Sequence, residues 1–173
     1  AAARRNDVMD PLFQAREGNG PGLLAQARAL LGGQRDLVAN AANLSALLFG
    51  ALEQVNWVGF YFLKKGELVV GPFQGKPACV TIPLGKGVCG TAAATRQVQR
   101  VADVHAFPGH IACDIDSRSE IVVPLLTHGV LRGVLDLDSP VTDRFSQRDE
   151  NMLVQLAGLF VDSVDWEEPV ARG

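Results

Sequence analysis

Apolar residues recur at helical spacing near the start of the chain and again near its end. One stripe runs from Leu23 to Leu31 and stops at Gly32-Gly33, a frequent signal for the C-terminus of a helix. A second stripe continues over residues 37–52, and a third over residues 145–166, with Ser146 as the expected N-cap. We therefore expect two helices before the middle of the chain and one long helix after it.

The middle of the chain is rich in the β-branched and aromatic residues that strands favour. Residues 71–77 interrupt the pattern, residues 84–95 predict a glycine-rich loop opening a short helix, and residues 102–119 lack sustained periodicity. The expected strands are residues 56–63, 67–70, 78–82, 98–101, 120–126 and 130–138. This order predicts an α+β fold, a central antiparallel sheet flanked by N-terminal and C-terminal helices.

Composition narrows the class of protein. With 173 residues, 47% of them hydrophobic, the chain has room for one domain, which we place at residues 21–166 between tails at 1–20 and 167–173. The formal net charge of -3 disfavours nucleic-acid binding, and no apolar run is long enough to cross a membrane. The N-terminus does not resemble a secretory signal, and an odd count of three cysteines suits a reducing compartment. We expect a soluble, cytoplasmic protein.

Three carboxylates are expected at one end of the last predicted hairpin. Asp136 and Asp138 lie two residues apart in a strand, so their side chains leave the same face. A two-residue turn at His128-Gly129 would pair Glu120 with Leu137, whereas a three-residue loop pairs Glu120 with Asp136 and closes the apolar face. We therefore expect the three-residue loop.

Carboxylates at such short separations repel one another, so at least one should hold a proton near neutral pH unless a cation lies among them. One interpretation is a solvated strand end, where acidic residues are ordinary. The other is a pocket for an ammonium group or a metal ion, with a protonated carboxyl as general acid. Metal is the weaker version, because no His or Cys accompanies the acids at a recognisable ligand spacing.

The cysteines differ in their expected surroundings. Cys79 falls in a predicted strand, where it is most simply a small buried hydrophobic residue. Cys89 lies near a helix N-terminus, whose dipole can lower the pKa of a thiol. Cys113 occupies the irregular segment near His110, where a thiol can be exposed and reactive. Their separations match neither a zinc motif nor a CxxC pair.

Other motifs carry less weight. Residues 85–90 (GKGVCG) match GxGxxG with Asp103 downstream, but Pro83 in the preceding strand and the short following helix disfavour dinucleotide binding. Residues 71–76 lack the spacing of a phosphate loop. His105 and His110 are expected to order their loop by hydrogen bonds. Trp57 is either a core residue or one wall of a small-ligand pocket.

Six segments, taken in order and with their spacing, resemble a known family. They are NWVGFYFL, GPFQGKPACV, IPLGKGVCGTA, HIACD, SEIVVPL and GVLDLDSP. Over residues 36–160 the chain is similar to the free methionine-(R)-sulfoxide reductases, which are built on a GAF domain. The resemblance implies reduction of the R epimer of free methionine sulfoxide and not of protein-bound residues. Reduction by thiols through a sulfenic acid and a disulfide requires no metal or organic cofactor. The resemblance also implies a homodimer and thioredoxin or a similar dithiol as reductant.

The resemblance further implies roles for seven residues. Cys113 would be the attacking thiol and Cys79 the resolving thiol, with Cys89 as an alternate or secondary disulfide partner. Trp57 would pack beside the methyl group of the substrate. The amino group and the sulfoxide oxygen would be served by an acidic pocket of Glu120, Asp136 and Asp138. The alternatives are a GAF-type small-ligand sensor and a redox sensor, both without turnover; a sensor would need no such combination of thiols and acids.

Overall fold

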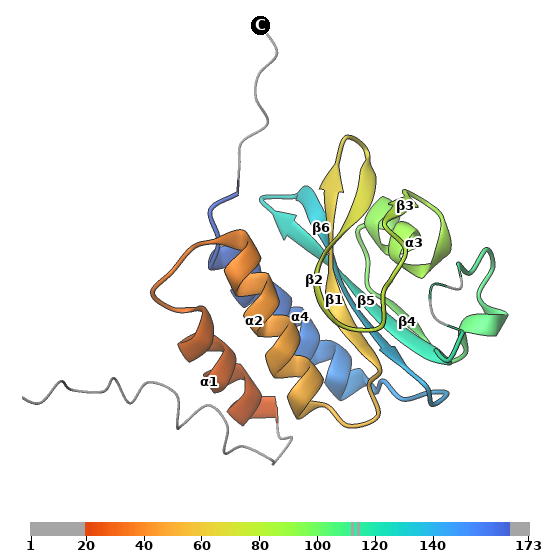
Figure 1. Cartoon of the computed structure of the whole chain (residues 1–173), viewed down its shortest axis with the longest axis horizontal. Helices are drawn as coiled ribbons and strands as arrows, with labels where there is room; N and C mark the ends of the chain where they lie inside the picture. Colours follow the sequence, from red (N-terminus) through yellow and green to blue (C-terminus); the bar gives the residue numbers. More distant parts are fainter. Residues whose placement is uncertain (1–19, 112, 114, 167–173) are drawn as a thin grey trace, which may run out of the picture.

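The computed structural model describes residues 20–111, 113 and 115–166 (Figure 1). The two expected tails therefore lie outside the described residues, except for Gly20, which belongs to the first helix. No helix in these described ranges combines the length and the apolar character needed to cross a bilayer.

Helices surround a single sheet in the order that the apolar pattern predicts. The sheet has the strand order β3-β2-β1-β6-β5-β4, and its neighbouring strands are antiparallel. The α+β class is confirmed. The elements are α1 (Gly20–Leu31), α2 (Leu37–Ala51), β1 (Trp57–Lys64), β2 (Glu67–Gly75), β3 (Thr81–Pro83), α3 (Gly87–Thr95), β4 (Gln99–Val101), the 3-10 turn η1 (Val104–Ala106), β5 (Ser119–Thr127), β6 (Val130–Ser139) and α4 (Gln147–Asp162).

Helix α4 begins where its cap predicts and ends earlier than expected. Ser146 and Asp149 form a capping box, each side chain accepting the other's backbone N–H. The helix stops at Asp162, and Ser163 caps it, because its backbone N–H and its hydroxyl both donate to the carbonyl of Phe160 at 3.0 and 2.8 Å. Trp166 lies beyond the helix, yet its indole N–H donates to the Val161 carbonyl at 3.0 Å, so its ring still covers the core.

The central strands β1, β5 and β6 are buried on both faces, and alternate residues serve different cores. On β1, Val58, Phe60 and Phe62 point toward α1, α2 and α4, whereas Trp57 and Tyr61 point toward α3. Figure 1 shows this division, with α3 on one side of the sheet and the other three helices opposite. Glu120 and Asp136 also point toward α3. Val122 of β5 lies on that side, and Glu120 is two residues before it, while Asp136 lies opposite it on β6.

The predicted register of the β5–β6 hairpin is wrong. The turn has two residues, His128 and Gly129, both with positive φ (48° and 79°). A bulge in β6 at position 132 then shifts the pairing, so that Glu120 lies opposite Asp138 instead of Asp136. The extra residue restores the alternation that a plain two-residue turn would have inverted, so the three acids still share one face.

A glycine makes this bulge possible beside β1. A Cβ at Gly133 would lie 2.1 Å from the carbonyl oxygen of Tyr61, so no larger residue fits there. The close approach depends on β1 and is invisible within the hairpin's own sequence. This explains why local turn preferences gave the wrong register.

The segment before Cys79 also differs from expectation. Strand β2 continues to Gly75, because Gly71 and Pro72 lie in a bulge opposite Phe60, where the missing N–H of proline is tolerated. The strand expected at residues 78–82 shrinks to β3 at Thr81–Pro83. Cys79 therefore lies in a loop and not in a strand.

Candidate active site

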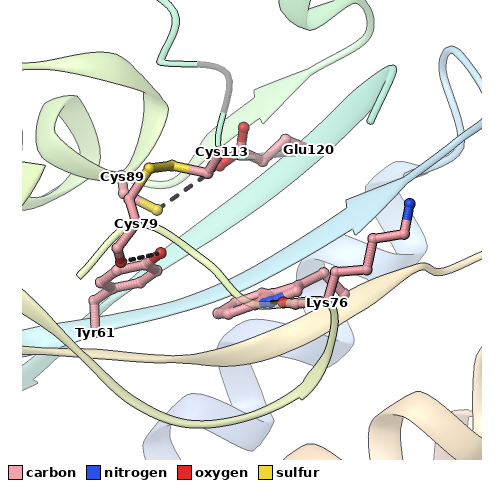
Figure 2. The surroundings of a disulfide bond; sticks show 7 residues. Tyr61, Lys76, Cys79, Cys89, Cys113 and Glu120 are labelled. Carbon is pink, nitrogen blue, oxygen red and sulfur yellow. Dashed lines mark hydrogen bonds between the residues drawn. A yellow bond between two sulfur atoms is a disulfide. The ribbon is translucent and has the colours of Figure 1, made fainter. Parts of the chain in front are cut away.

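Two loops on the α3 side of the sheet are joined by a disulfide bond. Cys79, between β2 and β3, is bonded to Cys113, between η1 and β5, with their Cα atoms 5.5 Å apart (Figure 2). Both residues are partly exposed. The pairing implied by the family resemblance is present, and the interpretation of Cys79 as an inert buried residue is wrong.

The loop carrying Cys79 is held from below by two aromatic side chains of β1. The indole N–H of Trp57 donates to the Lys76 carbonyl at 3.1 Å, and the hydroxyl of Tyr61 donates to the Cys79 carbonyl at 3.3 Å. On the outer side, the Lys76 ammonium forms an ion pair with Asp116, three residues after Cys113. These contacts keep the two cysteine loops side by side.

Below the disulfide lies a pocket whose floor is acidic. Glu120 and Asp136 are only 7% and 5% exposed, and Asp138 is half-buried. All three line the same pocket together with Trp57 and Cys113. The structure thus brings together the predicted acids, the predicted aromatic wall and the predicted attacking thiol.

Burial governs the protonation of this floor. Loss of solvent raises the pKa of Glu120 well above its usual range, and repulsion from Asp136 and Asp138 raises it further. Burial also raises the pKa of Asp136 to about 6. The pair therefore retains a proton near neutral pH, as expected from the sequence, and can donate it to a group in the pocket.

The expectation that the helix dipole lowers the thiol pKa of Cys89 is wrong. The Cys89 thiol is 4% exposed and lies 3.7 Å from a carboxyl oxygen of Glu120. Burial, followed by the charges of Asp136 and Glu120, raises the pKa of Cys89 well above its usual range. Desolvation and nearby negative charge thus outweigh the dipole of the nine-residue helix α3.

The position of Cys89 corrects a second expectation. Linear spacing associates no cysteine with the acids, yet ligand atoms of Cys89, Glu120 and Asp136 all lie within 4.8 Å of one another. Helix α3 supplies the thiol, and the paired strands β5 and β6 supply the carboxyls. Only packing of the helix on the sheet creates this group.

The GxGxxG segment has a packing role instead of a nucleotide-binding geometry. A Cβ at Gly90 would lie 2.4 Å from the Pro83 carbonyl, so glycine allows α3 to approach β3 closely. The neighbouring strands are antiparallel, which excludes a parallel βαβ unit in this sheet.

Comparisons with known proteins identify the family of this chain. A GAF domain model matches residues 22–162. The chain belongs to the GAF domain family. Within that family it is close to the free methionine-R-sulfoxide reductase of Escherichia coli, with 57% identity over 128 residues, 74% of this chain and 78% of the relative. Protein YtsP of Bacillus subtilis is 58% identical over 78% of this chain and 84% of its own length.

A solved structure of a similar protein agrees in fold. The reduced form of fRMsr from Staphylococcus aureus is 50% identical, with a TM-score of 0.83, over 85% of this chain and 96% of that one. The same protein has also been solved in complex with its substrate. This chain is thus a GAF domain protein of the free methionine-R-sulfoxide reductase group.

Two residues that line the pocket of this GAF domain, Tyr61 and His110, were not predicted from the sequence as site residues. Tyr61 lines the pocket and anchors the Cys79 loop; its position four residues after Trp57 in one strand was the available signal. His110 also lines the pocket, three residues before Cys113, where only a loop-ordering role was expected. Burial, followed by the charge of His105, lowers the pKa of His110 and favours its neutral ring. The expected ordering contact holds for His105, whose Nδ1 lies 3.2 Å from Asp103.

Proposed function

We propose that this protein reduces free L-methionine-(R)-sulfoxide to L-methionine, with Cys113 as the attacking thiol and Cys79 as the resolving thiol. The observation that carries the proposal is a Cys79–Cys113 disulfide above a pocket floored by buried carboxyls. The close relationship to free methionine-R-sulfoxide reductases supports the same activity.

The pocket suits a single amino acid as substrate. The carboxyls of Glu120, Asp136 and Asp138 would receive the ammonium group, and Trp57 would pack beside the methyl group. A residue inside a polypeptide has no free ammonium group, so it would leave the buried acids unpaired. Selectivity for the free amino acid follows, because unpaired buried polar groups are costly.

The reaction needs an acid because a sulfoxide oxygen leaves poorly until it is protonated. A buried carboxyl that is neutral near pH 7 would protonate the sulfoxide oxygen, and the oxygen would be transferred to the sulfur of Cys113. The products are methionine, reduced by two electrons, and Cys113 sulfenic acid. The Cys79 thiol then attacks the Cys113 sulfur, forming the disulfide and releasing water.

A dithiol such as thioredoxin would return the enzyme to its reduced form by thiol–disulfide exchange. The partial exposure of Cys79 and Cys113 supports this role, because an attacking thiolate must reach a disulfide sulfur. Cys89, in contrast, is buried with a raised thiol pKa, which makes it at most a secondary disulfide partner. We further propose a homodimer, which light scattering on the purified protein would check.

Single-turnover assays test the assignment of the thiols. Cys113→Ser should lower the rate of methionine formation by at least about 10³-fold, because the nucleophile is lost. Cys79→Ser should form one methionine per site and then stop, leaving a sulfenic acid at Cys113 that dimedone traps. Full activity of the first variant, or loss of the first turnover in the second, would contradict these roles.

An epimer-resolved assay tests the substrate. We expect reduction of the free R epimer by the wild-type protein with a dithiol, and no reduction of the S epimer or of peptide-bound methionine sulfoxide. A ligand sensor without turnover would instead bind the free amino acid and return it unchanged.

A further inference from the structure

A thiol and two carboxyls meet at the floor of the pocket in a way that the reductase chemistry does not require. An ammonium group needs only acceptors, and the carboxyls provide them. Cys89 contributes neither the attacking nor the main resolving sulfur in the proposed reaction, yet its Sγ lies 3.7 Å from Glu120 Oε1. The presence of sulfur among buried oxygens calls for a different partner.

One of these carboxyls has an atom with no hydrogen-bond partner. Asp136 is 5% exposed, and its Oδ1 accepts no hydrogen bond from any described residue. A buried carboxylate oxygen left in this state is costly. Asp136 lines the pocket, so a cation held there would be coordinated by its carboxyl.

The spacing of the three groups matches a small thiophilic cation. Zinc binds sulfur at about 2.3 Å and carboxylate oxygen at about 2.1 Å, which in a tetrahedron separates the two ligands by about 3.6 Å. The observed 3.7 Å between Cys89 and Glu120 agrees, and the ligand atom of Asp136 lies within 4.8 Å of both. Magnesium and calcium prefer six or more oxygen ligands and are disfavoured by the sulfur.

We propose that Cys89, Glu120 and Asp136 form a binding site for a thiophilic divalent cation such as Zn²⁺, and that this cation and the substrate ammonium group exclude one another. Three protein ligands leave a fourth tetrahedral position for water. Binding displaces the thiol proton and the proton held by the carboxyl pair, so the two carboxylates and the thiolate become ligands. The exclusion, but not the metal site itself, rests on the proposed function.

Cobalt(II) provides a direct test, because a thiolate bound to Co²⁺ gives a charge-transfer absorption band. The oxidised 173-residue chain is the appropriate form, since its disulfide leaves Cys89 as the free thiol among three cysteines. We expect one equivalent of Co²⁺ to give the band and Zn²⁺ to remove it by displacement. Absence of the band in the wild-type chain would overturn the proposal.

Matched variants locate the site. Cys89→Ser should lose the band, and its affinity for Zn²⁺ should fall at least about 100-fold. Replacing a residue that only supports the ligands costs about 10- to 100-fold, so a larger loss identifies Cys89 as a ligand. Glu120→Gln should keep the thiolate band but need more Co²⁺ to reach it. The Cys79→Ser/Cys113→Ser variant should give the same cobalt band as the wild-type chain, although it has no turnover. A band that persists in Cys89→Ser would place the metal elsewhere, and circular dichroism verifies folding of each variant.

The same double variant tests mutual exclusion, because it keeps the three ligands without a disulfide over the pocket. Adding L-methionine-(R)-sulfoxide should decrease the cobalt band, and the apparent affinity for substrate should fall as Co²⁺ rises. Substrate that binds without changing the band would overturn exclusion. A band in a protein that never binds the substrate would support the metal site and contradict the proposed function.

Discussion

The two faces of the sheet are built from the same strands but do different work. The face toward α1, α2 and α4 is largely apolar, with Phe60 and Leu135 of the sheet and Leu156 of α4 fully buried. The face toward α3 buries a thiol and two carboxyls next to Val122 and Val134. The larger apolar core lies on the first face and contributes the greater share of the folding free energy, which offsets the cost of burying ionisable groups on the other face.

The difference teaches how a small domain can carry a buried acidic pocket. Each strand sends every second residue to each face, so the acids add charge to one core without disturbing the other. Substitutions of buried residues on the face toward α1, α2 and α4 should change stability and leave the turnover of the folded protein unchanged. Substitutions of the ionisable groups on the α3 face should do the reverse.

The largest effect is expected for Leu156→Ala on α4. Leu156 is 0% exposed in the core between α4 and the sheet, and truncation leaves a cavity. We expect the free energy of unfolding in urea to fall by about 2–5 kcal/mol. Turnover per folded molecule should be unchanged. Val154→Ala, at a position 45% exposed on the same helix, is the control and should change stability by less than about 0.5 kcal/mol. A loss of turnover in folded Leu156→Ala would remove the separation of the faces.

The opposite behaviour is expected for Glu120→Gln on β5. The amide keeps the volume but cannot donate a carboxyl proton to the sulfoxide oxygen, so kcat/KM should fall about 100-fold. Stability should be unchanged or higher, because the variant lacks an ionisable group whose charged form is disfavoured by burial and then by the charges of Asp136 and Asp138. Steady-state kinetics and urea unfolding at pH 7 measure both quantities. Wild-type kcat/KM in the variant would exclude Glu120 as the acid.

A smaller effect concerns the pH dependence of stability. The pKa of Asp136 is raised from 3.8 to about 6 in the folded state, so between these values the folded chain binds more protons than the unfolded chain. The contribution of Asp136 to stability is therefore greatest at low pH and decreases as pH rises through this window. The difference in unfolding free energy between wild type and Asp136→Asn should fall from pH 4 to pH 6 and then level off.

The control for this measurement is Asp116→Asn. The side-chain hydrogen bond and charge of Lys76 lower the pKa of Asp116, so its contribution has the opposite sign and is lost as pH falls. If the Asp136 difference also rose with pH, the carboxyl would not be in the desolvated environment described for it.

The smallest effect is expected at the ion pair between the two cysteine loops. Lys76→Met keeps an unbranched side chain, one atom shorter, and removes the charge opposite Asp116. Exposed pairs contribute only about 0.2–1 kcal/mol, so disulfide closure after the first turnover should slow by no more than about fivefold. Quenched-flow thiol counting measures this rate. The first turnover itself should be unaffected, and a slower first turnover would show that Lys76 acts on the substrate.

The sequence alone determines the elements and their faces. Helical periodicity and the Ser146 capping signal depend on residues within one or two turns, so α1, α2 and the start of α4 follow from local pattern. The shared face of Asp136 and Asp138 follows from the two-residue period of a strand. The six motifs indicate the family without any coordinates.

Tertiary structure alone decides which of these elements meet, and how. The β6 bulge depends on Gly133 approaching the Tyr61 carbonyl, and the loop position of Cys79 depends on β2 extending along β1. The contact of Cys89 with Glu120, and hence its raised pKa, exists only because α3 packs on the sheet. Local patterns report neighbours along the chain, whereas register, burial and charge coupling arise from segments that are distant in sequence and adjacent in space.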